Sequence, residues 1–174
     1  VNPLLFESCS ERVEYAPRKP AMHLNGPDKD VIIAGIALID LYGPTFYPKA
    51  LQTAAERYDW AQKDLENKVD HPRFFQFFAV HETEAWLLAA PELFPAEVKK
   101  ALPVKAVNPE TVNFDEPPAK LLERLYSQKT GRRYKKVTNG RELFGRLDPG
   151  VAYGKCPSLR ALLDKMLELA KGTL

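Results

Sequence analysis

Carboxylates that directly follow two apolar segments are the residues in this sequence best suited to chemistry. Asp40 ends the aliphatic run of residues 31–40, and Glu82 and Glu84 follow an aromatic run directly after His81. In open α/β sheets, ligands collect outside the carboxyl ends of the strands. Carboxylates that converge there offer the hard oxygen ligands that Mg²⁺ and Mn²⁺ prefer, and such an ion can activate water for attack on a phosphoryl group.

These considerations predict Asp40, Glu82 and Glu84 as ligands of Mg²⁺ or Mn²⁺. Glu84 and His81 are also candidate catalytic residues, His81 for proton transfer or phosphate contact. The segment resembles the start of the zinc protease pattern H-E-x-x-H, but the second His is replaced by Ala85, so that interpretation fails. A simpler alternative is that the Glu residues only complement a helix N-terminus, and that Asp40 only begins a turn.

The densest basic segment is residues 129–136, in which Tyr134 is interleaved with Lys and Arg. Such a segment suits a phosphate backbone and a stacked base. We therefore take Arg133, Lys135 and Lys136 as candidate nucleic-acid contacts, with a solvated loop as the alternative. The turn-rich segment 108–118 suggests no chemistry on physical grounds.

The elements that must position these residues follow from the hydrophobic pattern. We expect a strand buried on both faces at residues 31–40 and a second buried strand at residues 73–80. We expect helices at residues 49–69, 85–90, 95–102, 118–128, 139–146 and 157–171. This order predicts an α/β fold with a small, mostly parallel sheet flanked by helices and an α-helical C-terminal part. The expected organisation is a single domain over residues 1–174, with an α/β core in residues 1–90 and a mainly helical extension in residues 91–174.

The bulk properties exclude several classes of protein. The net charge of +2 is too small to indicate nucleic-acid binding by itself. Two cysteines cannot build a secreted-type disulfide framework, and the apolar runs are too short for a membrane span. No signal peptide is recognisable, so we expect a cytoplasmic protein without membrane contact. Since the sequence does not begin with Met, we also expect residues upstream.

The chain from about residue 36 onwards resembles a bacterial family known as domain of unknown function 4276. The resemblance lies in two longer motifs and several short ones: residues 38–43 (LIDLYG), 77–88 (FFAVHETEAWLL), 108–113 (NPETVN), 117–120 (PPAK), 134–136 (YKK) and 156–157 (CP). The family pattern is similar to a variant of the Toprim fold of OLD-type nucleases, which is Rossmann-like. The resemblance implies a Mg²⁺-dependent nuclease in anti-phage defence, with an ATPase partner encoded nearby.

The resemblance also implies a catalytic Glu in a turn near the N-terminus. Residues 5–12 can be aligned with that turn, which makes Glu7 the candidate general acid or base. However, Pro17 and Pro20 interrupt the helix that should follow, and the interval from Glu7 to Asp40 is shorter than the pattern requires. Either an upstream segment completes the site or this protein has a shortened version of it.

Two hypotheses for function result. The first is a metal-dependent phosphoryl-transfer enzyme, a Toprim-like nuclease that acts on nucleic acid in a defence system. The second is a non-catalytic regulatory or interaction subunit of a partner ATPase, in which the acidic residues serve only the fold.

Overall fold

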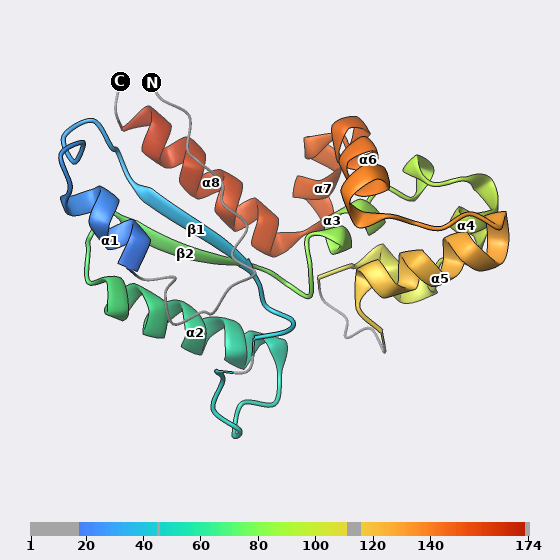
Figure 1. Ribbon diagram of the computed structural model, residues 1–174, viewed down its shortest axis with the longest axis horizontal. Helices are drawn as coiled ribbons and strands as arrows, with labels where there is room; N and C mark the ends of the chain where they lie inside the picture. The colour runs from blue at the N-terminus through green and yellow to red at the C-terminus, as the bar shows by residue number, and fades with distance from the viewer. Residues whose placement is uncertain (1–17, 45, 111–115, 173–174) are drawn as a thin grey trace. The chain divides into compact units, whose positions relative to one another are not determined.

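The computed structural model describes residues 18–44, 46–110 and 116–172 (Figure 1). The predicted catalytic Glu7 lies outside these residues. In chain order the elements are α1 (Arg18–Asn25), β1 (Gly35–Asp40), α2 (Ala54–Val69), β2 (Phe74–Ala79), α3 (Glu84–Leu88), η2 (Pro91–Leu93), α4 (Ala96–Ala101), η3 (Val104–Val107), α5 (Pro118–Thr130), the π-helical turn η4 (Lys136–Gly140), α6 (Arg141–Arg146), α7 (Pro149–Lys155) and α8 (Pro157–Lys171).

The described residues form a mixed α/β structure in which β1 and β2 pair as a two-stranded parallel sheet. Pairing begins where the Gly35 amide donates to the Arg73 carbonyl, at 2.8 Å. The prediction of a small parallel sheet with helices is confirmed, whereas its Toprim or Rossmann-like character stays a prediction. β2 is almost entirely buried, as predicted. β1 is only half-buried, so the prediction that it is buried on both faces is wrong.

The first strand begins later than the aliphatic run predicts. Residues 31–34 precede β1, and the Val31 side chain is 80% exposed. The Arg73 guanidinium accounts for this difference, since it donates to the carbonyl oxygens of Lys29 and Ile32. These carbonyl oxygens already accept hydrogen bonds from a side chain, so they do not require pairing with a neighbouring strand.

The chain divides into two compact units. The first comprises residues 1–39 and 44–77, and the second comprises residues 40–43 and 78–174. The predicted single-domain organisation, with parts meeting near residue 90, stays a prediction.

In the first unit, α2 begins at a capping box in which Thr53 and Glu56 satisfy each other's backbone amides. The predicted start at residue 49 is therefore too early. The interval directly after residues 5–12, where Pro17 and Pro20 are expected to interrupt a helix, lies largely outside the described residues, and Pro20 itself lies in the first turn of α1. The first backbone amides of a helix have no intrahelical partner, so a proline there costs no hydrogen bond.

In the second unit, the helices enclose an apolar core. Its buried residues come from segments between α3 and α6, and they are Leu87, Leu88, Phe94, Val98, Ala106, Leu121, Leu122, Leu125, Tyr126, Tyr134 and Leu143. The hydrophobic pattern misses α7, which contains Gly150 and Gly154. Its local signature is present, however, since the Asp148 side chain accepts from the Gly150 amide at 2.8 Å and Pro149 is the first helical residue.

None of the helices in the described part of the chain is long and apolar enough to cross a membrane.

Candidate functional site

Backbone pairing at the end of β1 brings Asp40 next to the segment that carries the two glutamates. The Leu41 amide donates to the Ala79 carbonyl at 2.9 Å, and the Tyr42 amide donates to the His81 carbonyl at 3.1 Å. Because both strands run in the same direction, their carboxyl ends lie at one edge of the sheet. The prediction that Asp40 and the His81–Glu84 segment adjoin one another therefore agrees with the structure.

His81 makes the turn from β2 into α3. Its φ of 69° lies in the left-handed region, which costs free energy for residues other than glycine but is less uncommon for His, Asn and Asp. The turn lets Glu84 begin α3 directly after the strand. His81 is itself buried, and in the structure it is the residue at which the chain turns from β2 towards α3.

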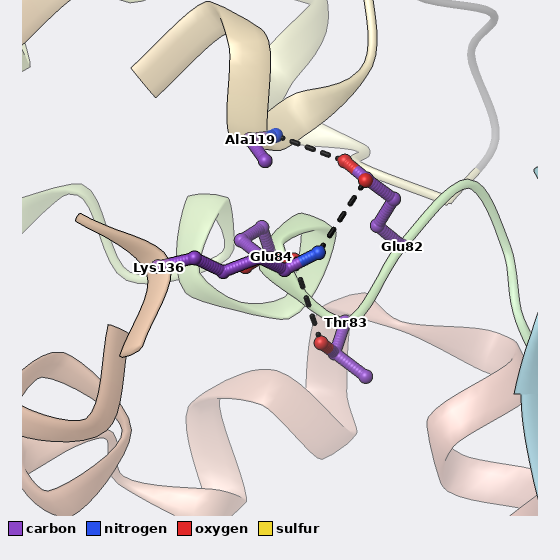
Figure 2. A network of polar contacts seen from close by, with 5 residues as sticks. All are labelled: Glu82, Thr83, Glu84, Ala119 and Lys136. Atoms are coloured by element: carbon purple, nitrogen blue, oxygen red, sulfur yellow. Dashed lines mark hydrogen bonds and ion pairs between the residues drawn. The ribbon is translucent and has the colours of Figure 1, made fainter. Parts of the chain in front are cut away.

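The two glutamates share one cation, the ammonium of Lys136 (Figure 2). The Lys136 Nζ lies 3.1 Å from the Glu84 Oε2 and 3.4 Å from the Glu82 Oε1. Glu84 is only 1% exposed, whereas the Lys136 side chain is 49% exposed. A nearly fully buried carboxylate is thus neutralised by a lysine that reaches in from the solvent. We call Asp40, Glu82, Glu84 and Lys136 the acidic cluster.

Further hydrogen bonds hold the two glutamates in place (Figure 2). The second oxygen of Glu82, Oε2, accepts from the Ala119 amide at 3.0 Å. Ala119 lies in the first turn of α5, so Glu82 caps that helix in addition to binding Lys136. The Thr83 hydroxyl donates to the Glu84 Oε2 at 3.5 Å. Glu82 therefore does serve as a helix cap, but for α5 rather than for the helix that follows it in sequence.

The electrostatics of the cluster show an excess of negative charge. Burial raises the pKa of Asp40 to about 6, with Glu82 and Glu84 adding to the rise and Lys136 opposing it. Burial lowers the pKa of Lys136, but the carboxylates of Glu84, Glu82 and Asp40 outweigh this effect and raise it overall. One lysine thus does not fully compensate three carboxyl groups.

Asp40→Asn is expected to stabilise the protein at pH 8 and to have no effect near pH 3.5. The native pKa of about 6 exceeds the ordinary aspartate pKa of 3.8, so the charged carboxylate lowers native stability as the pH rises through this interval. With solvent screening of this partly exposed group, the gain at pH 8 is about 1–2 kcal/mol. Urea unfolding at both pH values measures it; equal stability of mutant and wild type at pH 8 would contradict the pKa assignment.

The structure corrects one interpretation of the basic segment. Tyr134 is 1% exposed, and its ring packs against that of Tyr126 with 5.4 Å between centroids. It belongs to the core, so the expectation that it stacks on a base is wrong. Arg133 and Lys135 are exposed and stay candidate nucleic-acid contacts, while Lys136 joins the acidic cluster.

The Tyr134 hydroxyl is buried and forms no hydrogen bond with any residue that the structure describes. Burial, with Glu84 adding to it, raises the pKa of Tyr134, so the hydroxyl remains protonated. The space beside it depends on Gly140, where a Cβ would lie 3.2 Å from the hydroxyl oxygen.

Tyr134→Phe is therefore expected to be neutral or to stabilise the protein by about 1 kcal/mol, because it removes an unsatisfied polar group without leaving a cavity. Thermal unfolding of the two proteins tests this. A loss of more than about 1 kcal/mol would mean that the hydroxyl has a partner in solution.

Sequence reasoning missed Glu110. This carboxylate is buried and accepts hydrogen bonds from the Trp86 Nε1 at 2.8 Å and from the amides of Ser158 at 2.6 Å and Leu159 at 3.3 Å. It thereby caps α8, whose own N-cap residue Cys156 supplies no side-chain cap. That missing cap and the first-turn Pro157 were the signals that an acceptor must come from elsewhere in the chain.

The carboxylate oxygens of the acidic cluster are of the hard ligand type that Mg²⁺ and Mn²⁺ prefer. The described residues nevertheless contain no group of three or more His, Cys, Asp or Glu side chains arranged to share a metal ion. The distances describe carboxylates gathered on Lys136. An ion bound to them would have to displace that ammonium.

The model of a family described as a domain of unknown function (DUF4276) matches residues 6–167. Neither a curated protein nor a solved structure matches the chain.

Proposed function

The chain belongs to the family of domain of unknown function 4276, and we propose that its acidic cluster is the centre of a phosphoryl-transfer reaction that depends on Mg²⁺ or Mn²⁺. The specific form of the proposal is a Toprim-like nuclease of a bacterial defence system. The observation that carries it is the convergence of the Glu82 and Glu84 carboxylates on one cation, with Asp40 coupled to the same charges.

The parts of the cluster have distinct roles in this proposal. Glu84 and Glu82 are fixed by Thr83 and by the start of α5, which preorganises their oxygens as ligands. A bound divalent ion would polarise a phosphoryl oxygen and generate the attacking hydroxide. Lys136, once released from the carboxylates, would contact the phosphate. Glu7 and His81 stay predicted proton-transfer groups.

Asp40→Asn is the variant that tests the proposal, because it removes a carboxylate without weakening the fold. The wild-type chain is incubated with fluorescent single- and double-stranded DNA and RNA, in Mn²⁺, Mg²⁺ or EDTA. We expect cleavage that requires the ion and that falls roughly 100-fold or more in Asp40→Asn. Asp59→Asn, an exposed aspartate in α2, is the matched control and should cleave at the wild-type rate.

A second measurement distinguishes a variant that no longer binds the ion from one that no longer binds the substrate. Mn²⁺ should raise the melting temperature of the wild type and should raise that of Asp40→Asn less. Cleavage by Asp40→Asn at the wild-type rate, or the absence of any ion-dependent cleavage, would refute the enzyme proposal.

One observation favours the second candidate, a non-catalytic subunit that regulates a partner ATPase. Lys136 already neutralises Glu82 and Glu84, and Glu82 also caps α5, as a purely structural cluster requires. Under this alternative Mn²⁺ has no effect on the melting temperature, and Asp40→Asn leaves binding of the ATPase unchanged.

A further inference from the structure

A second feature of the second unit is a cavity of about 710 Å³. Residues from η2, α4, α5, η4 and α6 line it. Three of them, Phe94, Tyr126 and Leu143, are buried members of the apolar core. The cavity therefore has a floor that is apolar and partly aromatic, as ligand sites for organic molecules commonly do.

The lining of the cavity includes three cations that form no polar side-chain contact within the described part of the chain. Lys129, Arg132 and Arg133 are exposed, and their side chains make neither an ion pair nor a hydrogen bond to the residues that the structure describes. They lie within five residues of one another at the end of α5 and in the loop after it. Guanidinium groups in this setting are suited to bind phosphate in a bidentate manner.

Most of the acidic residues in the lining are paired with a cation. Glu142 pairs with Arg146 at 3.7 Å, and Glu97 lies 3.8 Å from Lys100, which does not line the cavity. Glu92 is the remaining acidic residue of the lining. Among the described residues, the lining therefore has more unpaired cations than unpaired anions, and this charge favours an anionic ligand.

We propose that this cavity binds a nucleoside phosphate, either as a free nucleotide or as the terminal nucleotide of a strand. The base would lie on the apolar floor formed by Phe94, Tyr126 and Leu143, and the phosphate would bind Arg133 and Lys129. A nucleotide has an aromatic base and a charged phosphate, and the cavity offers aromatic contacts for the first and cations for the second. The proposal does not require the acidic cluster to be catalytic.

The path of the chain connects the cavity to the acidic cluster. Arg133 lines the cavity and Lys136 binds the two glutamates, and three residues of chain span at most about 11 Å. A strand whose end lies in the cavity would thus have its following phosphates within reach of Lys136. This reach supports the terminal nucleotide of a nucleic-acid strand as one of the two possible ligands.

The test is a binding measurement in EDTA, where no ion-dependent cleavage takes place. The probe is a 5′-phosphorylated single-stranded DNA with a fluorophore at its 3′ end, and the readout is fluorescence anisotropy with the full chain. We expect the double variant Lys129→Ala/Arg133→Ala to bind at least about 10-fold more weakly than wild type. The matched control is Lys49→Ala/Lys171→Ala, which removes the same charge from exposed positions that do not line the cavity and should bind as wild type does.

Competition identifies the source of the ligand. Displacement of the probe by AMP shows that a free nucleotide suffices, whereas displacement only by an unlabelled phosphorylated strand shows a strand-end site. Three results would overturn the proposal: no binding by the wild type, equal losses in both double variants, or displacement by inorganic phosphate as effective as that by AMP. The second would indicate attraction by net charge alone, and the third would mean that the apolar floor plays no part. The experiment measures binding and not cleavage, so its result can be interpreted even if the nuclease proposal is wrong.

Discussion

Glu110→Ala is expected to lower the free energy of unfolding by about 3 kcal/mol. The substitution removes the common acceptor of the Trp86 indole and of the Ser158 and Leu159 amides. Two first-turn amides of α8 and a buried indole N–H would then be left without a partner, and each unsatisfied buried donor costs about 1–3 kcal/mol. Urea denaturation at neutral pH measures the loss.

Two further variants sharpen this prediction. Glu110→Gln keeps an acceptor oxygen but lacks the charge that complements the helix N-terminus, so its loss should be smaller than that of Glu110→Ala. Glu168→Ala removes an exposed carboxylate from the same helix and should change stability by less than about 0.5 kcal/mol. Equal effects of Glu110→Ala and Glu168→Ala would contradict the capping role.

The Cys156 thiol provides a local readout of the same change. Burial raises the pKa of Cys156 to about 12, and the carboxylate of Glu110 adds to the rise. Loss of the carboxylate and looser packing at the start of α8 should both increase the reactivity of this thiol. The measurement is the rate of thiol labelling under native conditions, with Cys9 replaced by Ser in both proteins. An unchanged rate would mean that the start of α8 stays closed without Glu110.

Lys136→Met is expected to lower the free energy of unfolding by about 2 kcal/mol at pH 8. The side chain is the cation shared by Glu84 and Glu82, and without it Glu84 would be a buried carboxylate with no compensating charge. The loss is smaller than for a fully buried pair because Lys136 is half-exposed. The loss of stability should be smaller at acidic pH. Because Lys136 lowers the pKa of Asp40, its removal raises that pKa, and Asp40 then becomes neutral as the pH falls.

Lys135→Met is the matched control for this variant. Lys135 is the adjacent lysine and is exposed, and it forms hydrogen bonds with Asn139 and Gly140 through its backbone amide and carbonyl, which a side-chain substitution keeps. Its replacement should therefore change stability by less than about 0.5 kcal/mol. If Lys136→Met is no less stable than Lys135→Met, the ion pairs contribute nothing in solution.

Mn²⁺ added to Lys136→Met distinguishes the two proposed functions. If the carboxylates form a cation site, Mn²⁺ should raise the melting temperature of Lys136→Met more than that of the wild type, because the ion no longer competes with the ammonium. If Mn²⁺ raises neither, the carboxylates serve the fold, and the metal-dependent enzyme is excluded while the ion-pair role stands.

The sequence by itself determined the two strands, most of the helices and the grouping of Asp40 with Glu82 and Glu84. These follow from local patterns: residues 73–80 are an apolar run of strand length, α8 has an apolar stripe at helical spacing, and polar groups directly follow each strand. Element boundaries were less accurate where a side chain intervenes, as Arg73 does before β1 and Thr53 does before α2.

Only the tertiary structure decided which charges meet. Lys136 is 54 residues from Glu82, and Glu110 is 48 residues from Ser158. No local periodicity records such pairings, because they depend on how the helices of the second unit pack around their core. Burial decides the rest: it makes Tyr134 a core residue instead of a stacking platform, and it raises the pKa of Asp40. The free energy of a charge or a hydroxyl depends on its desolvation, which only the folded chain determines.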